Sequence, residues 1–376
     1  GIPRVLAYWD RAPFWTTFLR SLGFDVCLSD KSTREMYENG LSAVTSDTVC
    51  FPAKLVHGHI RDLVAKDIDR IFMPVVTTVQ SENRAKTSES MCAVVKGYSL
   101  VVQNSDNPAE RFGVPFDNPL FHWYTTEDRL RQLSEYMQKA FGIAPDITAK
   151  AIGLGQAAMD SFHEQLLKAG RAAIDVAKAN GSYAVVLGSR PYHNDPLVNH
   201  DIPKMFASQG IAVLPPDAVP GANDVDLSNS RIDIVNNFHA RMLGAAVLAA
   251  QSDCLEFVQL VSFGCGHDAY LSDEIVRMMH EVGGKTPLVL KVDESDAAGP
   301  LRIRVRSFIE TVNMRYAAGA AHGEIHALPD PYPQKFTRAD RRRRVVLVPN
   351  TSHAFSRMMA AVFARQGLET VALPIG

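Results

Sequence analysis

The sequence has few cysteines, and their spacing excludes several classes of metal and disulfide protein. Five cysteines occur in 376 residues, at positions 27, 50, 92, 254 and 265, and no two of them form a CxxC pair. This spacing excludes zinc-ribbon and ferredoxin motifs, and the odd count without a secretory signal argues against a disulfide framework. Any metal cluster must therefore gather cysteines that are far apart in the sequence.

The sequence also has little net charge, no long apolar run and none of several common catalytic motifs. The formal net charge of −2 gives no electrostatic reason to expect a nucleic acid as a partner. No run of about 18 apolar residues is present, so we expect no membrane span, and without a signal peptide we expect a cytoplasmic protein. Walker A, HExxH and GxSxG motifs are missing, so ATP hydrolysis, zinc proteolysis and serine hydrolysis have no support.

Short apolar runs alternate with helical patterns along the chain, which is typical of an α/β fold with parallel sheets. We expect two Rossmann-like domains, a long helix between them, a linker and the start of a further β-α-β unit, with any cluster between the two domains. Their predicted ranges are 1–146, 147–182, 183–316, 317–344 and 345–376. Because nothing completes the last unit, we expect the chain to be a fragment of a longer protein.

Within the first predicted domain, we expect two short strands and one exposed loop. The apolar runs at 4–8 and 25–28 predict strands. The polar stretch at 77–90 predicts an exposed loop that leads to Cys92.

Three cysteines stand at predicted loop or turn positions near strand ends: Cys50, Cys92 and Cys265. Cys50 precedes Pro52 and a helical pattern, and the N-terminus of a helix favours negative charge, so we expect a lowered thiol pKa. Cys265 lies between two glycines at the end of an apolar strand. Three thiolates that converge would form an iron–sulfur site with one iron left open. The alternative is that each cysteine is a small buried core residue.

Five other side chains are candidates for contact with a substrate or with the cysteine ligands: Lys54, His57, Arg190, His193 and His200. A packing role is the alternative for the first histidine, and a structural turn role for the other two. The arginine follows a predicted buried strand, where α/β proteins bind ligands, and the alternative is an ordinary surface salt bridge.

Four stretches of the sequence resemble one known family. They are Ser46–His59 (SDTVCFPAKLVHGH), Arg190–Pro196 (RPYHNDP) with Asn199 and His200, Ser262–Gly266 (SFGCG) and Lys291–Glu294 (KVDE). Over roughly residues 1–316 the chain is similar to the 2-hydroxyacyl-CoA dehydratase-like proteins. It is most similar to the subgroup related to acyl-CoA dehydratase activases, within the superfamily that includes double-cubane proteins.

The resemblance implies an iron–sulfur protein whose cluster cysteines match Cys50, Cys92 and Cys265. It implies a [4Fe–4S] cluster, which aerobic preparation can remove, and an ATP-dependent activase that delivers a low-potential electron. A small-molecule or acyl-CoA substrate and a homodimer are further expectations. Many relatives have Cys-Pro where this chain has Cys92-Ala93, and three cysteines suit a single cubane.

Two functions are therefore compared. The first is an electron-accepting component of a low-potential reductase or dehydratase that is fed by an activase. The second is a non-catalytic α/β regulatory or ligand-binding module of an activase fusion protein, without metal.

Overall fold

The computed structural model of the protein describes residues 1–83, 88–295, 298–325, 327 and 336–374. It divides into two compact units, Gly1–Ala327 and Leu328–Gly376. Helices make up about half of the chain, and the strand pairs of the described residues are all parallel. The predicted α/β class with parallel sheets is thus confirmed.

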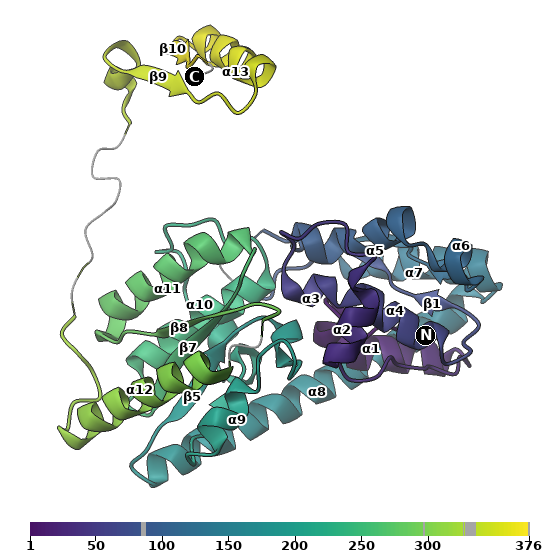
Figure 1. Cartoon of the computed structure of the whole chain (residues 1–376), viewed down its shortest axis with the longest axis horizontal. Helices are drawn as coiled ribbons and strands as arrows, with labels where there is room; N and C mark the ends of the chain where they lie inside the picture. The colour runs from purple at the N-terminus through teal and green to yellow at the C-terminus, as the bar shows by residue number, and fades with distance from the viewer. Residues whose placement is uncertain (84–87, 296–297, 326, 328–335, 375–376) are drawn as a thin grey trace. The chain divides into compact units, whose positions relative to one another are not determined.

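A four-stranded parallel sheet forms the centre of the second half of the first unit (Figure 1). Its strands, in the order β6-β5-β7-β8, are Val213–Leu214, Ala184–Gly188, Leu255–Ser262 and Leu288–Val292. The surrounding helices are α9 (Ile202–Ala207), α10 (Asn237–Gln251), α11 (Gly266–Gly283) and α12 (Ala298–Ala317), with 3-10 helices at Pro191–Asn194, Pro216–Ala218 and Ala222–Asp224.

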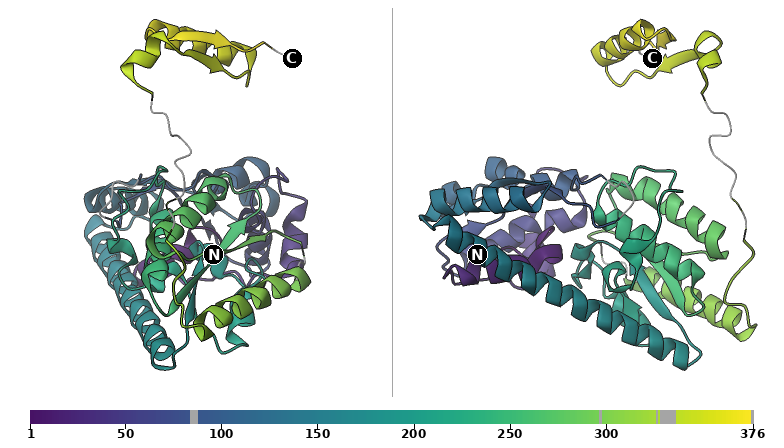
Figure 2. Two further views of the ribbon diagram at one scale, coloured as in Figure 1. Left: turned by 90° about the vertical axis from the view of Figure 1, so that its left-hand side faces the viewer. Right: turned by 180° about the vertical axis from the view of Figure 1, so that it is seen from behind.

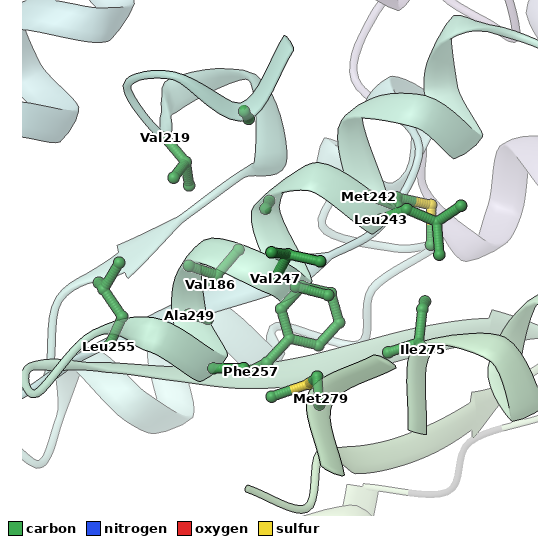
Figure 3. Packing of buried hydrophobic residues seen from close by; sticks show 14 of the residues in the cluster. Val186, Val219, Met242, Leu243, Val247, Ala249, Leu255, Phe257, Ile275 and Met279 are labelled. Atoms are coloured by element: carbon green, nitrogen blue, oxygen red, sulfur yellow. The ribbon is translucent and has the colours of Figure 1, made fainter. Parts of the chain in front are cut away.

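Alternate residues of β5 enter different cores, because successive side chains of a strand point to opposite faces. Val185 and Leu187 join the core formed with α9 and α12, whereas Val186 joins the core formed with α10 and α11. Figure 3 shows the second core, where Phe257 of β7 packs beneath Val247 of α10. Both faces of the sheet are therefore covered by helices.

The first half of the unit has shorter strands and more helices. Its helices are α1 (Tyr8–Ser21), α2 (Arg34–Leu41), α3 (Phe51–Lys54), α4 (Val56–Val64), α5 (Ala93–Ser105), α6 (Pro108–Phe112) and α7 (Thr126–Phe141). Its strands are β1 (Ile71–Phe72), β2 (Val75–Val79), β3 (Phe116–Asp117) and β4 (Leu120–Trp123), which pair as β1-β3 and β2-β4. These short pairs do not establish a Rossmann-like domain, so that finer description stays a prediction.

Two local expectations for this half are wrong, and a third holds only in part. The predicted strands at 4–8 and 25–28 are reduced to one bridge between Ile2 and Leu28, and α1 already begins at Tyr8. A short apolar run can be a buried irregular segment as well as a strand, and here residues 4–7 form bends and turns that lead into α1. The predicted loop at 77–90 begins inside strand β2, and its residues 84–87 lie outside the described residues.

One long helix, α8 (Pro145–Ala179), runs along most of the first unit, as Figure 2 shows from behind. Its 35 residues correspond to a length of about 50 Å. It contacts α1 and α7 in the first half, and β5 in the second half. The helix therefore ties the two halves of the unit together.

The second unit consists of a 3-10 helix (Arg338–Arg342), β9 (Val345–Val348), α13 (His353–Arg365) and β10 (Glu369–Ala372). The two strands pair in parallel, in the predicted strand–helix–strand order. Residues 326 and 328–335 of the predicted linker lie outside the described residues. Within the described ranges, no helix is both long and apolar enough to cross a membrane.

Candidate functional site

Three cysteines from separate parts of the first unit line a single pocket of about 570 Å³. Cys50, Cys92 and Cys265 are the residues that directly precede helices α3, α5 and α11, respectively. Cys27 and Cys254 are not among the residues that line this pocket. The structure thus brings together the three cysteines that the sequence analysis singled out, and each of them stands at the N-terminus of a helix.

Local sequence explains why two of these thiols can approach each other. Pro52 sits in the first turn of α3, where its missing N–H is not needed. Gly264 has φ +80°, and a Cβ at this position would lie 2.5 Å from the carbonyl oxygen of Thr48. Only glycine therefore allows the turn that carries Cys265 to lie against the segment that precedes Cys50.

The positions of the cysteines at helix N-termini do not by themselves determine the pKa values of their thiols. Burial raises the pKa of the Cys50 thiol to about 11, and the nearby Cys265 and Cys92 add to the rise, although the backbone N–H of Ala53 and the charge of Arg190 oppose it. Burial likewise raises the pKa of Cys265. The expected lowering is therefore wrong for the metal-free protein, because desolvation of a thiolate outweighs the helix N-terminus.

Arg190 directly precedes the 3-10 helix Pro191–Asn194, and its side chain is buried and hydrogen-bonded inside the protein. Its guanidinium donates to both carboxylate oxygens of Asp268, at 2.8 and 3.1 Å, and contacts His239 Nε2 at 3.2 Å. Asp268 also accepts the backbone N–H of Ser262 at 3.0 Å. Because the guanidinium is only 2% exposed, it acts as a buried positive charge that braces the turn of Cys265, and not as a surface salt bridge.

The two histidines of the Arg190–His200 stretch make contacts within the protein. Nδ1 of His193 accepts the backbone N–H of Arg190 at 3.0 Å, and its Nε2 lies 2.7 Å from the hydroxyl of Ser262. Burial lowers the pKa of His193 to about 3, so the ring is neutral. Nε2 of His200 donates to the backbone carbonyl of Asp293 at 2.8 Å. Both contacts fit the structural turn role.

Lys54 and His57 belong to the helical segment that follows Cys50, and each has an acidic partner. Lys54 Nζ lies 2.6 Å from Glu294 Oε1, which connects this segment to the residues after β8. Nδ1 of His57 lies 3.2 Å from Asp106 Oδ2 in a buried contact. Neither side chain lines the cysteine pocket.

Two tyrosines of the pocket were not singled out by the sequence analysis. Tyr98, on α5, is 4% exposed, and its hydroxyl has no hydrogen-bond partner in the described part of the chain. Burial raises its pKa to about 12, and the Cys50 thiol contributes to the rise. Tyr192 also lines the pocket. Tyr98 follows Cys92 by six residues on an amphipathic helix, and no local motif marks it.

The donor set does not suit a single metal ion. In the parts of the chain that the structure describes, no three His, Cys, Asp or Glu side chains are grouped closely enough to hold one ion. An iron–sulfur cluster places its protein ligands around several metal atoms, so its cysteines are more widely separated. Three thiols around one pocket, together with the unpartnered donor of Tyr98, fit a cluster of that kind.

The first part of the chain matches a known protein family. The family described as "CoA enzyme activase uncharacterised domain (DUF2229)" matches residues 1–219, a range that contains Cys50 and Cys92 but not Cys265. No curated protein matches the chain significantly.

Proposed function

The chain belongs to the family of the CoA enzyme activase uncharacterised domain, and from this membership we propose an iron–sulfur protein that accepts low-potential electrons from an ATP-dependent activase. It would serve a reductase or dehydratase of the 2-hydroxyacyl-CoA dehydratase-like class, with two Rossmann-like domains on either side of the cluster. The observation that carries the proposal is the shared pocket of three cysteines, each directly before a helix.

Cys50, Cys92 and Cys265 would hold a [4Fe–4S] cluster. When bound, such a cluster supplies one-electron transfer and leaves one iron without a protein ligand. The helix N-termini favour the negative charge of the thiolates. Arg190, buried and paired with Asp268, adds a fixed positive charge near Cys50 and Cys265.

The remaining pocket residues would orient a substrate and supply protons. The hydroxyl of Tyr98 is a donor without a partner in the described residues, and burial keeps it protonated because its pKa is raised to about 12. Tyr192 and Ser262 line the same pocket. These groups would donate hydrogen bonds to an oxygen of a small-molecule or acyl-CoA substrate.

The proposal is tested by anaerobic reconstitution of the full chain with iron and sulfide. We expect a brown protein with visible absorbance and about four irons per chain. Replacing Cys50, Cys92 or Cys265 by Ala should remove most of the iron, whereas Cys27→Ala and Cys254→Ala serve as matched controls and should retain it. A wild-type chain that stays colourless and iron-free would contradict the proposal.

A further variant tests the contact between the two cysteine-bearing segments. Gly264→Ala places a Cβ against the carbonyl of Thr48 in a backbone conformation that alanine tolerates poorly. We expect this variant to bind less iron, although all three ligands are retained. Gly266→Ala is the control, because a Cβ there meets no atom within 4 Å, and equal loss of iron in both variants would count against the role of this contact.

A metal-free regulatory or ligand-binding module of an activase fusion is the second candidate. The observation that favours it is the pKa of Cys50, which burial raises to about 11, so that the thiol is neutral and can serve as core packing. Reconstitution separates the two candidates, because this module would bind no iron in any variant.

A further inference from the structure

A cavity of the first unit is separate from the cysteine pocket. Its volume is about 710 Å³, and it lies between α9 and α12 and reaches Ser32 in the first half of the unit. None of its lining residues lines the cysteine pocket. A cavity of this size is within the range that holds small-molecule ligands.

Positive side chains dominate the charge of this cavity. Arg302 and Arg306 lie one turn apart on α12, both are exposed and line the cavity, and neither makes a hydrogen bond or ion pair within the described residues. Lys204 and Asp201 also line it and pair with each other at 2.7 Å. Two like charges four residues apart slightly destabilise a helix, and with Asp201 paired to Lys204 the two arginines leave an excess of positive charge at the cavity.

The backbone at the edge of the cavity is strained. His200 and Asp201 are consecutive non-glycine residues with φ of 51° and 55°, a left-handed conformation that costs energy for such residues. The hydrogen bond from His200 to the carbonyl of Asp293 holds this turn in place. Strain of this kind occurs most often at binding sites.

Apolar side chains form part of the remaining cavity wall, beside the polar residues Ser32, Ser208 and Gln209. Pro196, Leu197 and Met205 line it on one side, and Val305 lies between the two arginines on α12. A wall of this composition can cover the organic part of a ligand whose charged end is bound by guanidinium groups.

We propose that this cavity binds a small molecule that carries a phosphate group. Guanidinium groups bind phosphate through paired, charge-assisted hydrogen bonds. Arg302 and Arg306 would contact the phosphate oxygens, Lys204 would add a third positive charge, and the apolar wall would cover the organic part. The site does not depend on the proposed cluster, because the two pockets share no lining residue.

Calorimetric titration of the metal-free full chain tests the proposal with three probes: ADP, pyrophosphate and adenosine. We expect ADP to bind and adenosine not to bind. Equal affinity for ADP and pyrophosphate would identify phosphate itself as the recognised group, whereas tighter binding of ADP would identify an organic phosphate ester. If neither phosphate compound binds, the proposal is overturned.

Substitutions on α12 test whether the phosphate compounds bind in this cavity. Arg302→Ala and Arg306→Ala should each weaken binding at least tenfold. Arg304→Ala is the matched control, because Arg304 is on the same helix, does not line the cavity and donates to the carbonyl of Val289. Circular dichroism of each variant verifies folding. Equal binding by wild type and by the Arg302→Ala/Arg306→Ala double variant would overturn the assignment, and neither result bears on whether the chain binds iron.

Discussion

His59 is a histidine that folding keeps neutral. It is fully buried, with Nδ1 2.7 Å from the hydroxyl of Ser29 and Nε2 2.9 Å from that of Ser32. Burial is the main cause that lowers its pKa to about 4. Its hydrogen bonds and its burial fit a packing role, and its titration links the stability of the protein to pH.

Stability should therefore fall on mild acidification. The unfolded chain takes up a proton at His59 below about pH 6.5, whereas the folded chain does so only near pH 4. The unfolding free energy should drop by about 1.4 kcal/mol per pH unit from this residue, between roughly pH 6.5 and pH 4. Urea unfolding at pH 7 and pH 5 measures the drop.

His59→Gln isolates the contribution of His59 to the pH dependence of stability, because an amide can form hydrogen bonds with both serines but does not titrate. We expect the variant to lose less stability than wild type between pH 7 and pH 5. The same loss in both proteins would show that other groups, such as the buried His193, cause the entire pH dependence of stability.

At the scale of residues, the positions of the three cysteines were easier to predict from the sequence than the pKa values of their thiols. Each of the three cysteines adjoins a pattern that marks the start of a helix, so their positions at loop or turn ends could be read from the sequence. The pKa of Cys50 could not, because the rise depends on burial and on neighbours that only the fold brings close. Tyr98 could not be predicted for the same reason, because it and Cys50 are distant in the sequence and only the fold places both in one pocket.

Helix α8 offers a test of packing at the scale of elements, because two of its glycines have opposite surroundings. A Cβ at Gly153 would meet nothing within 4 Å, whereas a Cβ at Gly170 would lie 1.9 Å from the carbonyl oxygen of Ala218. The first glycine only weakens the helix, and the second permits its contact with the following half of the unit.

Alanine at these two positions should therefore have effects of opposite sign. Gly153→Ala should raise the unfolding free energy by about 0.5–1 kcal/mol, since alanine favours a helix. Gly170→Ala should lower it by about 2 kcal/mol, because the backbone at Ala218 must move. Chemical denaturation of both variants measures the difference, and a loss in both would show that α8 tolerates no alanine at either site.

Helices were predicted better than strands for a physical reason. The periodic pattern predicted a long helix in residues 147–182, and α8 spans Pro145–Ala179. The apolar run at 4–8 carries no period long enough to separate a strand from a buried turn, and Leu6 has φ 48°, which no strand adopts. The buried strands β5, β7 and β8 were predictable because glycine or polar residues bound each apolar run.

At the scale of the whole molecule, the two units differ in how much apolar surface they bury. The first contains four hydrophobic clusters. In the described part of the second, Val348 is the one buried apolar residue, whereas Leu347, Phe355 and Met358 are at least half exposed. A two-stranded sheet with one helix and so small a core is marginally stable.

A peptide of residues 336–376 should therefore be largely unfolded in isolation. Circular dichroism with thermal melting should show little helix and no cooperative transition, whereas a chain of residues 1–327 should unfold cooperatively. A sharp melting transition of the peptide would show that β9, α13 and β10 are stable without further packing. The order of these elements was predictable from sequence, but the small extent of their core was not.

The three pocket cysteines stand 42 and 173 positions apart along the chain. If the pocket holds the proposed cluster, the unfolded polypeptide offers iron no preformed chelate, so folding and not the metal bears the entropy cost of bringing the thiols together. Loading would then follow folding in time, and the loaded protein would melt at a higher temperature than the empty one because only the native state binds.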